Sequence, residues 1–117
     1  MNITLVSDLH LDISGYLEMP GGDVLILAGD ICEAKELSKE FHSTKELDRK
    51  PGAFPCYDFF LYQVPKYKKV FYVMGNHEHY HGKFWKTKIE LQKILPANVT
   101  LLENECEEYE GVLFVGA

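Results

Sequence analysis

The sequence lacks the features of a membrane-spanning or secreted protein. No apolar run approaches the roughly 20 residues that a transmembrane helix needs. Residues 1–4 have neither the basic stretch nor the cleavage site of a signal peptide. The cysteines, Cys32, Cys56 and Cys106, are odd in number, widely spaced and without a C-x-x-C motif, which argues against a disulfide framework. We therefore expect a soluble protein of the reducing cytoplasm.

Basic charge is also scarce in this chain. Lysine and arginine number 12 against 18 aspartates and glutamates, which gives a net charge of −6 and a pI of about 5.3. Proteins that bind nucleic acid or anionic membranes nonspecifically have the opposite balance, so neither partner is expected. A small anionic substrate is still compatible with the sequence, because bound metal cations reverse the local field.

Several catalytic motifs are missing as well. The sequence contains no G-x-S-x-G elbow, no phosphate-binding P-loop and no G-x-G-x-x-G turn. These absences argue against a serine hydrolase, a P-loop nucleotidase and a dinucleotide-binding enzyme.

The pattern of apolar residues predicts one α/β domain in the 117 residues. Continuous apolar, β-branched runs at 2–7, 24–28 and 70–74 indicate buried strands. Apolar residues at helical spacing predict helices at 33–47, 54–67 and 82–95. Shorter apolar runs predict further strands at 99–102, 105–109 and 112–115. Residues 11–22 are expected to form a loop. The fold class is therefore α/β, with a mixed sheet and flanking helices.

Each of the three long strands ends in side chains that bind metals. Asp8 and His10 follow the first strand, Asp30 follows the second, and Asn76 and His77 follow the third. Ligands collect beyond the carboxyl ends of neighbouring parallel strands, so these side chains are expected to meet. Carboxylate, imidazole and amide groups together predict a site for divalent metals.

Each motif has a plain structural alternative when taken alone. Asp8 and Asp30 are also suitable helix caps, and His10 is then an incidental surface residue. Glu78 either orients a ligand or only carries favourable charge at a helix start. The histidines at positions 77, 79 and 81 form an H-x-H-x-H pattern that offers a less favoured zinc site.

Taken in order, the three motifs resemble the signature of the calcineurin-like metallophosphoesterases: Asp8-Leu9-His10, Gly29-Asp30 and Gly75-Asn76-His77-Glu78. The resemblance implies that Asp8 and His10 bind a first metal ion, that Asp30 bridges both ions and that Asn76 binds the second. It also implies that His77 and Asn76 contact the substrate phosphoryl group. His77 would then be the catalytic residue that protonates the leaving group or stabilises its charge.

The resemblance implies an enzyme that hydrolyses phosphomonoesters or phosphodiesters with a water activated by two divalent ions. The ions are manganese, iron, zinc or cobalt, among which the sequence does not choose, and the partner is a small phosphorylated substrate. One rival hypothesis is a non-catalytic metal-binding or scaffold protein on the same fold. A second rival is a structural protein in which the motifs are accidental.

The sequence departs from the family pattern in its second part. The later Gly-His and Gly-His-x-His motifs are absent. We therefore expect residues 1–117 to be the amino-terminal portion of a single metallophosphoesterase domain, the first half of a four-layer αββα sandwich. Unpaired sheet edges and uncovered apolar surface would then favour self-association.

Two further features leave alternatives open. Tyr80, Phe84 and Trp85 either shape a substrate wall or, as is more usual for aromatic residues at helical spacing, belong to the core. Cys32 either faces the metal ions or, as we favour, is a small buried apolar residue.

Overall fold

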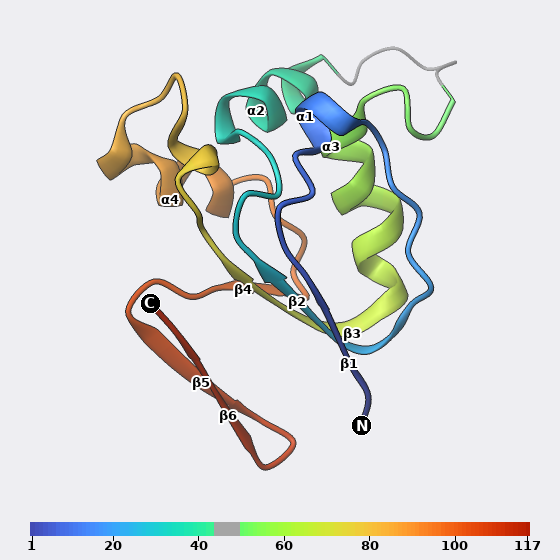
Figure 1. Ribbon diagram of the computed structural model, residues 1–117, viewed down its shortest axis with the longest axis vertical. Coiled ribbons are helices and arrows are strands. Elements are labelled where there is room, and N and C mark those ends of the chain that lie inside the picture. Colours follow the sequence, from blue (N-terminus) through green and yellow to red (C-terminus); the bar gives the residue numbers. More distant parts are fainter. Residues whose placement is uncertain (44–49) are drawn as a thin grey trace.

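Four parallel strands form the centre of the molecule (Figure 1). The computed structural model describes residues 1–43 and 50–117. The strands pair in the order β1-β2-β3-β4, and their bounds are Ile3–Val6, Gly22–Ala28, Tyr67–Val73 and Val99–Leu101. All three pairings are parallel, so the carboxyl ends of the strands lie at one edge of the sheet.

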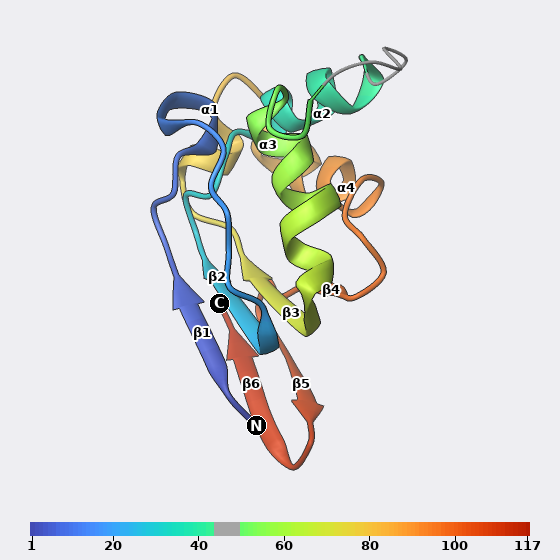
Figure 2. The same ribbon diagram turned by 90° about the vertical axis from the view of Figure 1, so that its right-hand side faces the viewer.

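Helices cover one face of this sheet (Figure 2). They are α1 (Leu11–Ser14), α2 (Ala34–His42), α3 (Pro55–Asp58) and α4 (Phe84–Gln92). The chain continues from α3 through a π-helical turn at Phe59–Gln63 and a 3-10 turn at Val64–Lys66. A further 3-10 turn, His77–His79, follows β3. The main core lies between this layer and the sheet, where Leu25 and Tyr72 meet Leu37 and Phe60.

A buried glutamate joins two of the helices. Glu40 on α2 accepts hydrogen bonds from the backbone N–H groups of Cys56 (3.0 Å) and Tyr57 (3.1 Å) in the first turn of α3. These groups have no partner within their own helix, so Glu40 caps α3 from a distance. Burial raises the pKa of the Glu40 carboxyl, while the hydrogen bonds oppose that rise.

A hairpin covers part of the opposite face of the sheet. Strands β5 (Glu105–Tyr109) and β6 (Val112–Gly116) pair antiparallel around a two-residue turn. Both turn residues, Glu110 and Gly111, have positive φ angles, of 49° and 80°, as a tight hairpin turn requires. Parallel and antiparallel pairings therefore lie in two separate sheets, within the α/β class that the sequence predicts.

Most of the expected elements are present, with shifted ends. The loop expected at 11–22 contains the short helix α1. The helix expected at 33–47 is present as α2, and its expected part at 44–47 lies outside the described residues. Among residues 1–43 and 50–117, no helix is long and apolar enough to span a membrane.

The aromatic residues around α4 are not in the core, so the prediction that they belong to the core is wrong. The exposed fractions of Tyr80, Phe84 and Trp85 are 46%, 66% and 71%. Helix α4 instead buries Thr87 and Leu91. Apolar side chains are also exposed on the strands, and self-association through them stays a prediction.

Ring stacking between the two sheets generates a stability prediction. Phe114 on β6 stacks on Phe71 of β3, with ring centroids 4.3 Å apart. Phe114→Ala should lower the free energy of unfolding by about 3 kcal/mol, because it removes a buried ring and leaves a cavity. Val115→Ala is the matched control, because Val115 is the next residue on β6 and is 75% exposed. Its substitution should lower the free energy of unfolding by under about 0.5 kcal/mol. Urea unfolding measures both, and equal effects would contradict the packing role of Phe114.

Candidate metal centre

Backbone hydrogen bonds hold the loops after β1 and β2 side by side. The N–H of Asp8 donates to the carbonyl of Gly29 at 2.9 Å, and the N–H of His10 donates to the carbonyl of Asp30 at 3.1 Å. The pairing of the two strands thus continues past their ends. It sets Asp8, His10 and Asp30 at one edge of the sheet, as expected for parallel neighbours.

Two glycines allow the loops after β2 and β3 to touch. Gly29 has a φ of 88°, and a Cβ there would lie 3.1 Å from the backbone nitrogen of Gly75. A Cβ on Gly75 would clash with Asp30 Oδ1. Glycine at both positions therefore lets the second and third motifs approach to backbone contact.

Three of the candidate ligands converge. Asp8, His10 and Asp30 each offer a ligand atom, and these atoms lie within 4.8 Å of one another. His10 Nε2 is 3.8 Å from Asp8 Oδ1. His10 Nδ1 is buried and has no hydrogen-bond partner among the described residues. Two carboxylates and an incompletely partnered imidazole form a donor set that fits a divalent ion.

The same three residues have unusual backbone angles. The φ angles of Asp8, His10 and Asp30 are 55°, 46° and 54°, in the left-handed region that residues other than glycine rarely adopt. Such angles persist only where the surrounding structure enforces them, and they cluster at functional sites. The strain here coincides with the convergent ligand atoms, which supports a functional role for the cluster.

Asn76 lies next to this cluster rather than within it. The backbone N–H of His77 donates to Asp30 Oδ1 at 2.8 Å, which places the Asn76–His77 segment against Asp30. The Asn76 side chain is exposed, and its Nδ2 donates to the hydroxyl of Tyr80 at 3.4 Å. This contact leaves Asn76 Oδ1 as an acceptor for a metal ion or a substrate.

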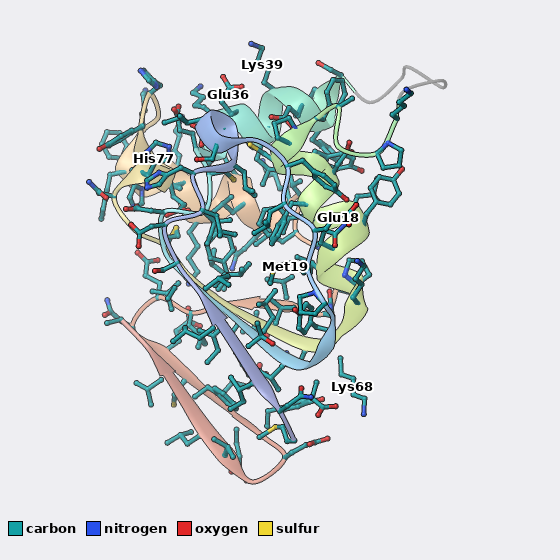
Figure 3. The ribbon with its side chains drawn as sticks, turned by 45° about the vertical axis from the view of Figure 1, so that its right-hand side comes forward. Glu18, Met19, Glu36, Lys39, Lys68 and His77 are labelled. Atoms are coloured by element: carbon teal, nitrogen blue, oxygen red, sulfur yellow. The ribbon has the colours of Figure 1, made fainter. Side chains whose placement is uncertain are left out.

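The His77 side chain is buried and held by an aspartate that the sequence analysis missed. His77 lies close to the short blue helix α1, which carries Asp12 (Figure 3). Its Nε2 lies 3.1 and 3.0 Å from the two carboxylate oxygens of Asp12. Its ring packs edge-on against that of His10, with centroids 4.7 Å apart. The D-x-H-x-D spacing from Asp8 to Asp12 was the available signal in the sequence, and the α1 turn carries Asp12 to His77.

Glu78 joins the loops after β2 and β3 and also lies in the 3-10 turn His77–His79, so its role in orienting a ligand stays a prediction. Its carboxylate is almost completely buried and accepts five hydrogen bonds of 2.6–3.2 Å. The donors are the backbone N–H groups of Asp30, Ile31, Cys32 and Gly75 and the hydroxyl of Tyr72. Burial is the main reason that the pKa of Tyr72 is raised well above its ordinary value, so the phenol stays a donor to Glu78.

The other two histidines of the H-x-H-x-H pattern, His79 and His81, have different partners. His79 Nδ1 is 2.8 Å from the hydroxyl of Thr87, and His81 Nδ1 is 2.8 Å from Glu33 Oε1. The hydrogen bond to Glu33 raises the pKa of His81. Neither histidine joins a metal-ligating cluster among the described residues, so the geometry gives no support to an H-x-H-x-H zinc site.

Cys32 is buried in the core, as the favoured interpretation expects. Its partner is the buried Cys56, and both are free thiols. The hydrogen bond to Cys32, together with burial, raises the pKa of Cys56. Neither residue is therefore arranged as a thiolate nucleophile.

Comparison with protein families agrees with this geometry. The family model described as calcineurin-like phosphoesterase matches residues 1–115. The chain belongs to this family. Calcineurin-like phosphoesterases generally hydrolyse phosphoesters with divalent metal ions, and the convergent cluster of this member fits that use. Searches of curated proteins and of solved structures gave no significant match.

The Glu78 contacts predict that this residue controls the metal site without touching the metal. Glu78→Gln replaces one acceptor oxygen by an NH₂ group that faces N–H donors. We expect Mn²⁺ affinity to fall about 10–100-fold, the usual effect of losing a residue that orients ligands. The free energy of unfolding should fall by about 3 kcal/mol, because buried donors lose their partner.

The matched control for this prediction is Glu108→Gln, which makes the same change in charge at an exposed position on β5. Calorimetric titration with Mn²⁺ measures affinity in both variants. If Glu78→Gln binds Mn²⁺ as the parent chain does, Glu78 has no role in positioning Asp30.

Proposed function

We propose that this protein is a metal-dependent phosphoesterase that hydrolyses small phosphomonoesters or phosphodiesters. The observation that carries the proposal is the convergence of Asp8, His10 and Asp30 beside the buried pair of His77 and Asp12. Ligand atoms for a cation and a positioned imidazole are thereby adjacent, which is the combination that phosphoester hydrolysis needs.

The donor atoms assign a role to each ligand in the proposal. Asp8, His10 and Asp30 would hold one divalent ion, and Asp30 and Asn76 would hold a second. Bound divalent ions would supply acidification of water and neutralisation of phosphoryl oxygens. The oxygen and nitrogen donors suit manganese, iron, zinc or cobalt alike.

His77 would supply the proton or the positive charge. Asp12 accepts a hydrogen bond from His77 Nε2, which fixes the orientation of the ring. His77 Nδ1 makes no hydrogen bond with the described residues and is left for the reacting group. Such an imidazole can protonate a leaving alkoxide or stabilise its charge.

The number of ligands supports a proposal about domain organisation. The second ion would have only Asp30 and Asn76 as protein ligands, whereas catalytic metal sites usually have about three. We therefore propose that residues 1–117 form the amino-terminal portion of one phosphoesterase domain, to which further ligands belong.

The bridging role of Asp30 is testable by stoichiometry. In the full chain, Asp30→Asn should abolish Mn²⁺ binding at both positions, because both proposed ions share this carboxylate. Asp8→Asn should weaken binding at one position only. Calorimetry with Mn²⁺ counts the ions, and an unchanged count in Asp30→Asn would rule out the bridge.

Loss of His77 should separate catalysis from metal binding. His77→Ala should lower turnover of an aryl phosphate about 10²–10⁴-fold, the usual contribution of a positioned acid or base, while metal content stays near that of the parent. Turnover and metal analysis are made on the same sample. A stoichiometric loss of metal would make His77 a ligand instead, and bound metal without turnover in the parent would favour the scaffold hypothesis.

A further inference from the structure

An apolar pocket lies directly beside the proposed reaction site. It has a volume of about 630 Å³ and runs from Asn76 past Tyr80 to Phe84, with Met74 and Leu102 among its walls. This volume lies in the range of about 300–1,000 Å³ that small-molecule sites occupy. The pocket begins at a residue that we assign to the metal centre, so one molecule can contact both.

Tyr80 connects the pocket to the reacting groups. Its hydroxyl accepts the hydrogen bond from Asn76 Nδ2, and its ring lies 4.7 Å from that of His77 between centroids. The pocket wall and the proposed catalytic residue are therefore in ring contact. A phosphoester with its phosphoryl group at Asn76 and His77 would direct its organic group along Tyr80.

The lining of the pocket indicates which organic group it accepts. Phe84 is 66% exposed, and its ring packs against that of His79, with centroids 4.4 Å apart. Neither lysine nor arginine occurs among the described residues that line the pocket, and the one carboxylate among them, Glu103, lies 3.9 Å from Lys88 Nζ. The lining therefore offers a second phosphate no lysine or arginine of its own, whereas an uncharged ring would gain apolar and stacking contacts.

We propose that this pocket binds an uncharged aromatic group of the substrate, with Phe84 and Tyr80 as specificity-determining residues. The assignment rests on the proposed phosphoesterase function. It also accounts for aromatic side chains that α4 and the preceding turn leave exposed instead of burying in the core. The substrate class is then a phosphoester that carries a single phosphate and an aromatic ring, not a polyphosphate or a sugar phosphate.

Paired substrates test this specificity in the full chain loaded with Mn²⁺. 3-Phenylpropyl phosphate and propyl phosphate have leaving groups of similar chemistry, so a difference in kcat/KM reports contacts of the ring. The parent should prefer the phenyl compound, and Phe84→Ala should reduce that preference roughly tenfold, the scale of one aromatic stacking contact. Trp85→Ala is the control, because Trp85 is more exposed but does not line the pocket.

A binding measurement separates this proposal from the proposed function. Calorimetry with the non-hydrolysable 3-phenylpropylphosphonate should show affinity that falls about tenfold in Phe84→Ala and stays unchanged in Trp85→Ala. Phe84-dependent binding without hydrolysis of either ester would support the pocket and overturn the enzymatic role. Hydrolysis of both esters at equal kcat/KM, or phosphonate affinity that does not change in Phe84→Ala, would contradict binding of the aromatic group in this pocket. Neither result would contradict the phosphoesterase function.

Discussion

The buried carboxylate of Glu78 joins the two loops on which most of the candidate site lies. A carboxylate taken out of water costs several kcal/mol unless its lone pairs find donors. Here five N–H and O–H groups surround it, four of them from the backbone on either side of the site. Because the donors come from the loops after β2 and β3, satisfying this one charge fixes the position of Asp30 relative to Asn76 and His77. The close approach of Gly29 to Gly75 follows from the same constraint.

This rigid frame explains how three strained residues can lie together. Left-handed backbone costs of order 1–3 kcal/mol for each residue other than glycine, and Asp8, His10 and Asp30 all adopt it. Their neighbours Leu11 and Ile31 are buried in the helix-side core and joined by a backbone hydrogen bond of 2.8 Å. Packing directly behind the loops thus holds angles that an isolated loop would relax.

The sequence predicted the strands and their motifs because buried parallel strands are continuous apolar runs, and ligands gather at their carboxyl ends. It did not reveal the contact between Asp12 and His77, because that contact depends on a four-residue helix within an expected loop. It also misplaced the aromatic residues near α4. Apolar residues such as Phe84 and Leu91 occur on both sides of this helix, so periodicity does not decide which side faces the sheet.

The acidic character of the candidate centre would link metal binding to folding. Asp8 and Asp30 present carboxylate oxygens near one another, and Asp12 and Glu33 do so beside His77. Like charges at such distances repel, and the strained backbone adds to this cost. A cation that binds only the folded arrangement stabilises it in proportion to RT ln(1 + [L]/Kd). The hairpin-side core around Phe71 and Phe114 is separate from the residues behind the site. A bound cation would therefore stabilise the folded protein by offsetting a cost that arises on the helix side of the sheet.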